Sequence, residues 1–161
     1  MELTFHGAAR EVTGSCHVVR VHGKTILLDM GLFQGRRAEV HHKNEVLPVD
    51  PHSVDAVVLS HAHIDHAGRL PYLIRRGYRG PIFTTPATRD LCRVLLSDSA
   101  HIQEKDAEFL ARHHRDAPEP LYVLQDVSTM LTQVRPHRYG ERVEVLPGIH
   151  ARFTDAGHIL G

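Results

Sequence analysis

The alternation of apolar and polar positions predicts strands near both ends of the chain. Residues 2–8 alternate, and residues 16–31 contain two apolar stretches separated by His22-Gly23, a pair typical of a tight turn. Residues 141–158 show the same pattern of two short strands. We therefore expect an antiparallel hairpin close to each end.

The middle of the chain predicts buried strands alternating with helices. Residues 53–60, SVDAVVLS, form a near-continuous apolar run, which is typical of a strand buried on both faces. Residues 66–78 have apolar positions at helical spacing and end at Gly77, and residues 80–86 suggest another short strand. Residues 31–51 are polar and without periodicity, which predicts a long loop.

Two further helices are expected in the second half. Residues 86–116 predict a long helix, broken or bent, and residues 124–134 predict a shorter helix with Asp126 in its first turn. The apolar stripe expected for the long helix consists of Leu91, Val94, Leu95, Ile102, Phe109 and Leu110. Strands mixed with helices predict an α/β fold, a mixed sheet with flanking helices.

The composition is typical of a soluble globular chain and does not indicate the kind of binding partner. The 161 residues are 42% hydrophobic and 24% charged, with a formal net charge of zero and a pI of about 7.3. Overall charge therefore neither favours nor excludes a nucleic-acid partner. Histidine is unusually frequent, with 15 residues, of which His41-His42 and His113-His114 lie in polar stretches and are expected at the surface.

Targeting signals and membrane spans are not expected. The N-terminal residues lack a basic segment followed by an apolar core, and no apolar run approaches a membrane span. Cys16 and Cys92 form no CxxC pair, so reduced thiols in a cytoplasmic protein are favoured over a disulfide.

The segment LSHAHIDHAG concentrates residues that bind metals. In an extended segment, residues two apart point the same way, so His61 and His63 can meet on one metal at the end of the strand over 53–60. Asp65 and His66 follow as the chain turns into a helix, and they point elsewhere, which suits a second metal. Asp65 also suits a helix N-cap. Imidazole and carboxylate together favour zinc, with iron or manganese as alternatives.

Two isolated residues extend this candidate site. His158 follows a strand in a glycine-flanked turn, where a lone histidine usually has no special role, but beside this cluster it becomes a candidate third ligand for the His61/His63 metal. Asp29 ends the apolar stretch TILLD and is either a turn aspartate or the residue that orients a ligand. Two adjacent metals would hold a bridging hydroxide and clamp a scissile bond, which predicts hydrolysis but not the substrate.

These residues carry a resemblance to a known family. SHAHIDHAGRLPYL resembles the histidine motif of the metallo-β-lactamase fold, and GAAREVTGSCHVV, LLDMGLFQG and DAGHILG resemble its β-CASP branch of RNA-processing nucleases. The match runs through the whole chain in the family's order. The histidine motif alone would also fit glyoxalases, lactonases and tRNA-processing enzymes.

The resemblance implies a role for each matching residue. It makes Asp29 and Asp65 the catalytic carboxylates, with Asp29 orienting ligands. His61, His63 and His158 match ligands of a first zinc, whereas Asp65 and His66 match ligands of a second. Gly14 and Ser15 match a loop beside the active site, although an ordinary turn role is equally compatible with them.

The resemblance also implies that residues 1–161 form the N-terminal half of the domain. The family's bridging aspartate, in a later SGD-like segment, and its β-CASP domain have no counterpart here. We therefore expect a zinc-dependent ribonuclease with two Zn²⁺ when complete, and one or none bound by this chain. The substrate would be RNA, and the sequence does not distinguish endonuclease from exonuclease cleavage. No membrane partner is expected. The uncovered apolar sheet surface favours aggregation or pairing with another chain, a homodimer included.

Two other functions fit the same residues. One is a metallo-hydrolase of thioesters or lactones, which shares the histidine motif. The other is a non-catalytic, metal-binding subunit, against which the intact ligand residues argue.

Overall fold

The fold is built on one mixed sheet. The computed structural model describes residues 1–112 and 118–161, and for residues 37 and 38 it describes the backbone alone, so the predicted surface pair His113-His114 lies outside the described residues. The six strands lie in chain order across the sheet: β1 (Glu2–Phe5), β2 (His17–Val21), β3 (Lys24–Leu28), β4 (Ala56–Val58), β5 (Ile82–Thr84) and β6 (Val134–Pro136). β1 to β3 are antiparallel, and β3 to β6 are parallel. The predicted α/β class with a mixed sheet is confirmed.

The N-terminal hairpin forms where the sequence predicts it. β2 and β3 are joined by His22 and Gly23, whose φ angles of 52° and 73° are the positive values that a two-residue hairpin turn requires. This turn sets the register that aligns Leu28 with His17, and Asp29 follows directly at the end of β3.

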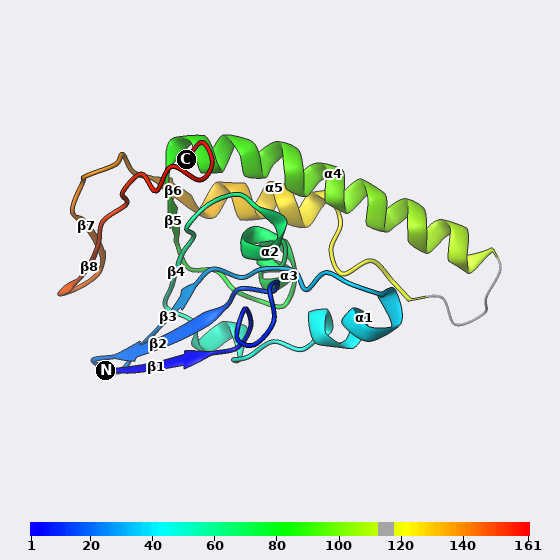
Figure 1. The fold of residues 1–161 in the computed structure, drawn as a ribbon, viewed down its shortest axis with the longest axis horizontal. Coiled ribbons are helices and arrows are strands. Elements are labelled where there is room, and N and C mark those ends of the chain that lie inside the picture. Colours follow the sequence, from blue (N-terminus) through cyan, green and yellow to red (C-terminus); the bar gives the residue numbers. More distant parts are fainter. Residues whose placement is uncertain (113–117) are drawn as a thin grey trace.

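Helices cover one face of the sheet (Figure 1). They are α1 (Arg37–Glu45), α2 (Ile64–Ala67), α3 (Leu70–Arg75), α4 (Pro86–Ala111) and α5 (Leu124–Gln133), with a short 3-10 turn at Pro51–Ser53. Alternate strand residues point into this layer, among them Val18, Leu27, Val57 and Ile82, all completely buried. They join apolar residues of α3, α4 and α5 in the main core.

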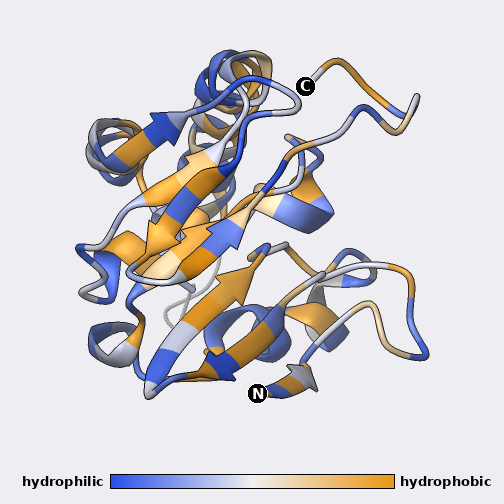
Figure 2. Cartoon of the chain, turned by 90° about the vertical axis from the view of Figure 1, so that its left-hand side faces the viewer, coloured by the Kyte–Doolittle hydropathy of each residue, from blue (hydrophilic) through white to orange (hydrophobic). Residues whose placement is uncertain are grey.

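Among the described residues, the opposite face of the sheet carries a small hairpin and no helix. β7 (Val143–Leu146) and β8 (Ile149–Ala151) pair antiparallel, which confirms the predicted C-terminal hairpin, and their cluster packs on Ala56 and Phe83. Figure 2 shows orange, hydrophobic residues next to blue, hydrophilic residues in the strands. Toward β1 the same face remains open, because Leu3 and Phe5 are 46% and 59% exposed.

Four expectations about the elements are wrong. Residues 31–51 are not one long loop, because α1 forms within them, and β6 forms where the sequence suggested the end of a helix. α4 runs unbroken over 26 residues. Its buried stripe consists of Thr88, Cys92, Leu96 and Ala100, whereas most of the predicted stripe is exposed, including Val94, Leu95, Ile102 and Phe109.

The missed helix α1 depends on distant side chains. Its residues lack an apolar face, but its C-terminal carbonyls find donors elsewhere in the chain. The buried Arg69 guanidinium donates to the carbonyls of Lys43 and Val46, at 3.1 and 3.0 Å, and Tyr72 Oη donates to that of Glu45. A local pattern does not reveal such contacts, which explains why the sequence predicted a loop.

Neither cysteine is paired. Cys16 and Cys92 are free and buried, and burial raises their pKa values to about 11 and about 12. The expectation of reduced thiols is confirmed, and the raised pKa values keep both side chains in the thiol form near pH 7. Among the described residues, no helix has the length and apolar character needed to cross a membrane.

Candidate metal centre

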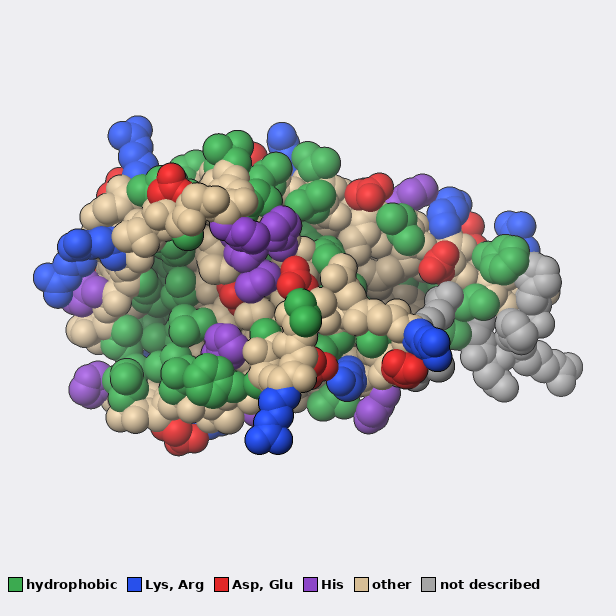
Figure 3. Space-filling view, viewed as in Figure 1, with side chains coloured by type: hydrophobic (Ala, Val, Ile, Leu, Met, Phe, Trp, Pro, Cys, Tyr) green, Lys and Arg blue, Asp and Glu red, His purple; other side chains and the backbone are tan. Residues whose placement is uncertain are grey.

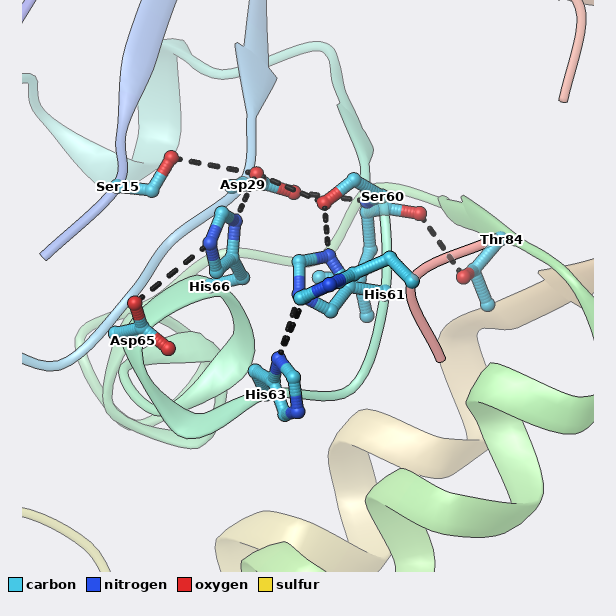
Figure 4. Close-up of polar contacts among 10 residues, drawn as sticks. Ser15, Asp29, Ser60, His61, His63, Asp65, His66 and Thr84 are labelled. Carbon is cyan, nitrogen blue, oxygen red and sulfur yellow. Dashed lines mark hydrogen bonds and ion pairs between the residues drawn. The ribbon is translucent and has the colours of Figure 1, made fainter. Parts of the chain in front are cut away.

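The candidate residues come together at the carboxyl ends of β3 and β4. These strands are parallel, so Asp29, just past β3, lies beside the segment that leaves β4 (Figure 4). The Asp29 backbone N–H donates to the carbonyl of Val58, and the Ser60 N–H donates to Asp29 Oδ1 at 2.8 Å. Asp29 has a φ of 62°, a left-handed value that aspartate tolerates better than most residues.

Three backbone segments are interlocked around this point. The Ser15 N–H donates to the carbonyl of Asp65, and the Gly31 N–H donates to that of Ser15, both at 2.8 Å. A Cβ on Gly31 would lie 1.6 Å from the Asp65 carbonyl oxygen, so only glycine fits there. This close packing explains why the segment LLDMG places a glycine two residues after Asp29.

The structure gathers His61, His63 and His158 at one place. Their ligand atoms all lie within 4.8 Å of one another. His63 Nδ1 is 3.0 Å from His61 Nε2 and 3.1 Å from His158 Nε2. Figure 3 shows a patch of histidine side chains at the surface. His61 and His63 are partly buried and His158 is exposed, so the patch is open to solvent on one side.

This group fits a zinc ion. Neutral imidazoles are preferred zinc ligands, and tetrahedral Zn–N bonds of about 2.0–2.1 Å place ligand nitrogens about 3.3–3.4 Å apart. The two separations above are within a few tenths of an ångström of that value. Three histidines with one open side match the ligand set of a catalytic zinc rather than a closed structural site.

Asp65 and His66 lie beside the three-histidine group. His66 Nε2 is 3.7 Å from Asp65 Oδ2, and the His66 ring centre is 4.1 Å from that of His61. The two side chains therefore place a nitrogen and an oxygen close together beside that group. Their role as ligands of a second metal stays a prediction. The alternative role of Asp65 as helix cap is wrong, because α2 begins after His63 and Asp65 lies within its first turn.

Asp29 orients neighbouring residues of the centre through hydrogen bonds. Asp29 is 7% exposed, and its Oδ2 lies 2.8 Å from His66 Nδ1. A carboxylate on Nδ1 leaves Nε2 free to bind a metal. The same oxygen accepts hydrogen bonds from the hydroxyls of Ser60 and Ser15, at 3.0 and 3.3 Å.

The local environment shifts two histidine pKa values in opposite directions. Burial, followed by the neighbouring His66 and His63, lowers the pKa of His61 to about 4. His61 is therefore neutral near pH 7 and ready to bind a metal. The hydrogen bond to Asp29 raises the pKa of His66. A larger fraction of His66 is therefore protonated at a given pH, and a metal that binds this side chain must displace that proton.

Gly14 and Ser15 are buried, and Ser15 is only 3% exposed. Ser15 contacts Asp29 and the backbone of Asp65 rather than an open surface. This position favours the turn role that the sequence left equally open. A contact with substrate stays a prediction for both residues.

Sequence reasoning missed two residues, Ser60 and Thr88, that position the ligands. Ser60 bridges Asp29 and His61, and Thr88 Oγ1 donates to the carbonyl of Gly161 at 2.7 Å, which ties the loop of His158 to the start of α4. The position of Ser60, directly before His61 at the end of a strand, is the sequence feature that could have indicated its role. Nothing local connects Thr88 with a segment 73 residues away.

A groove of about 710 Å³ begins beside His63. It runs between the loop after β3 and the exposed side of α4, and its walls are mainly apolar, with Phe33, Leu95 and Ile102 among them. Among the described residues, its lining includes no lysine or arginine.

Comparison with known proteins supports the assignment of this centre. Residues 9–78, which include Asp29 and the HxHxDH segment, match the model of the metallo-beta-lactamase superfamily. Members of this superfamily use bound metal ions, and the group His61, His63 and His158 could hold one.

The whole chain is similar to parts of longer proteins. It is 40% identical over 161 residues to ribonuclease TTHA0252 of Thermus thermophilus, and 32% identical to transcription termination factor FttA of Methanocaldococcus jannaschii. The chain spans about a third of the first relative (33%) and about a quarter of the second (24%). Among solved structures, Rm3 metallo-beta-lactamase is 22% identical, with a TM-score of 0.44 over 84% of this chain and 43% of that one.

Proposed function

We propose that this chain supplies the metal-binding part of a zinc-dependent ribonuclease. The observation that carries the proposal is the convergence of His61, His63 and His158, which come from two segments 95 residues apart. The similarity of the whole chain to a protein named as a ribonuclease supports RNA as the substrate. The relatives' names favour a cytoplasmic location in the same way.

The residues divide between two metal positions. His61, His63 and His158 would hold one zinc, and Asp65 with His66 would contribute to a second, iron or manganese being alternatives. Bound zinc would supply a Lewis acid that withdraws charge from the scissile phosphate. Asp29 holds His66 with its Nε2 free, and the open side of the group leaves access for a substrate.

The two positions should differ in affinity. Three histidines suffice for one zinc with an open coordination position. The second position has only Asp65 and His66 among the described residues facing it. We expect about one zinc per chain after dialysis and no RNA cleavage above background by residues 1–161 alone.

A matched pair of variants tests the zinc site. His63→Ala removes the nitrogen shared by both short contacts, whereas His101→Ala changes an exposed histidine on α4. Zinc content after dialysis should fall close to zero in the first variant and stay unchanged in the second. Equal zinc content in both variants would show that the histidine assignment is wrong.

A chimera tests the substrate. The matching third of ribonuclease TTHA0252 would be replaced by this chain, and cleavage of labelled single-stranded RNA would be measured. We expect cleavage that His63→Ala abolishes and His101→Ala retains. A folded, zinc-loaded chimera that hydrolyses a thioester or lactone but not RNA would favour the other hydrolase class. A chimera that binds zinc and cleaves none of these would favour a non-catalytic, metal-binding subunit.

A further inference from the structure

Ser60 occupies a special place between the carboxylate and the histidines. Its backbone N–H donates to Asp29 Oδ1 at 2.8 Å, and its hydroxyl donates to Asp29 Oδ2 at 3.0 Å. The same hydroxyl oxygen lies 2.9 Å from His61 Nδ1 (Figure 4). Ser60 is exposed, so water could satisfy its hydroxyl, yet the side chain joins two residues of the centre.

The direction of these hydrogen bonds is fixed by chemistry. An ionised carboxylate only accepts, so the hydroxyl proton of Ser60 points to Asp29. The hydroxyl oxygen then has lone pairs available, and the neighbouring His61 Nδ1 must be the donor. This arrangement puts the His61 proton on Nδ1 and leaves a lone pair on Nε2.

The free nitrogen of His61 is the one that faces the metal position. His61 Nε2 lies 3.0 Å from His63 Nδ1, within the three-histidine group. The opposite tautomer would put a proton on Nε2 and block the ligand. The hydroxyl of Ser60 therefore selects the form of His61 that can bind.

Asp29 performs the same task for His66 without an intermediary. Its Oδ2 lies 2.8 Å from His66 Nδ1, which leaves His66 Nε2 toward Asp65. One carboxylate thus faces both metal positions, directly on one side and through a hydroxyl on the other. The backbone bond from Ser60 N–H to Oδ1 holds that carboxylate in the orientation both contacts need.

We propose that Ser60 is a positioning residue that carries the orienting effect of Asp29 to His61. The proposal rests on the metal centre proposed above and deepens it. Ser60 touches neither metal nor substrate. It acts by fixing the tautomer and ring orientation of one ligand, an effect for which removal of a hydrogen-bonding partner typically costs about 10–100-fold in metal affinity.

Three variants test the proposal by zinc affinity, measured through competition with a chelator. Ser60→Ala removes the hydroxyl, Ser60→Thr retains it, and Ser128→Ala removes an exposed hydroxyl on α5 that bonds only its own helix. We expect about 10–100-fold weaker zinc binding for Ser60→Ala. Ser60→Thr should stay within about threefold of the original chain, and Ser128→Ala should match it.

A second readout needs no metal. The nitrogen chemical shifts of His61 in the zinc-free chain report which ring nitrogen carries the proton. We expect the Nδ1–H form to dominate in the original chain and in Ser60→Thr, and to lose that dominance in Ser60→Ala. A purely structural role for the hydroxyl would leave this tautomer balance unchanged.

Asp29→Asn completes a double-mutant cycle with Ser60→Ala. If the hydroxyl acts through the carboxylate, the affinity losses are not additive, and Ser60→Ala costs little in the Asp29→Asn background. Additive losses would overturn the proposal. Equal losses in Ser60→Ala and Ser60→Thr, or a Ser60→Ala chain that is unfolded before zinc is added, would overturn it as well.

The original chain separates this proposal from the proposed function. If it binds no zinc, the metal centre itself fails. If it binds zinc and Ser60→Ala binds equally well, the centre stands and only the role of Ser60 fails.

Discussion

Replacement of Arg69 by methionine should destabilise the loop that borders the metal centre. Arg69 is 1% exposed, and its Nε donates to the Gly31 carbonyl at 2.6 Å. Its Nη1 donates to the carbonyls of Lys43 and Val46 at the end of α1, and its guanidinium stacks over Phe33 at 4.8 Å. Burial lowers the pKa of Arg69. One side chain thus joins α1 to the segment that follows Asp29.

The size of the effect follows from these contacts. The Gly31 carbonyl is buried, and leaving it without a donor costs about 1–3 kcal/mol. The carbonyls of Lys43 and Val46 lie closer to solvent, so about 0.5–1.5 kcal/mol each is reasonable, with about 0.5–1 kcal/mol more for the contact with Phe33. Removal of the buried charge also removes its desolvation penalty, which offsets part of this loss of folding free energy. We expect a net loss of about 2–4 kcal/mol.

Urea unfolding followed by circular dichroism measures this loss. Arg79→Met is a matched control, because Arg79 also donates to two carbonyls, those of Ile74 and Tyr78, but is exposed. The control should lose at most about 0.5 kcal/mol. A loss in Arg69→Met below about 1 kcal/mol, or equal to the control, would show that this buried cation does not stabilise the loop.

Three further predictions concern the approach of the ligands and the sheet. Thr88→Val removes the hydrogen bond to Gly161 that holds the His158 loop. Zinc affinity, measured by competition with a chelator, should therefore fall about 2–10-fold. An unchanged affinity would mean that other contacts hold the loop. Gly31→Ala should bind zinc more weakly in chelator competition and unfold at lower urea, because its Cβ would meet backbone atoms rather than a flexible side chain. A stable variant that binds zinc would contradict the close packing of these backbone segments. The hydrogen bond from Lys24 lowers the pKa of Asp55 below 3.8, so its stabilising effect is present above that pH and is lost as pH falls through the folded pKa. The urea midpoint of Asp55→Asn should therefore lie below that of the original chain at pH 7 and approach it below pH 3.8, and a gap that persists in acid would contradict the pKa assignment.

The sequence by itself determined the features that depend on neighbours along the chain. The alternation in β1 to β3, the His22-Gly23 turn and the apolar run of β4 are local signals with local causes, and the structure confirms them. The HxHxDH spacing likewise predicts its own geometry, because a strand end fixes where His61 and His63 point. These features need little help from the rest of the molecule.

Only the tertiary structure decided the features that depend on residues far apart in the chain. α1 forms because Arg69 and Tyr72 satisfy its last carbonyls. α4 buries Cys92 and Leu96 rather than most of the predicted stripe, because the main core lies on that side. The pattern of one helix does not reveal which of its faces will meet a partner.

The same limit applies to the metal centre. The sequence named its candidate ligands, but the parallel register of β3 and β4 brings Asp29 to Ser60, and the contact of Thr88 with Gly161 brings His158 to His63. Ligand identity is a property of single residues, and local spacing suggests it. Ligand orientation depends on hydrogen bonds between separate segments, and these exist only once the chain has folded.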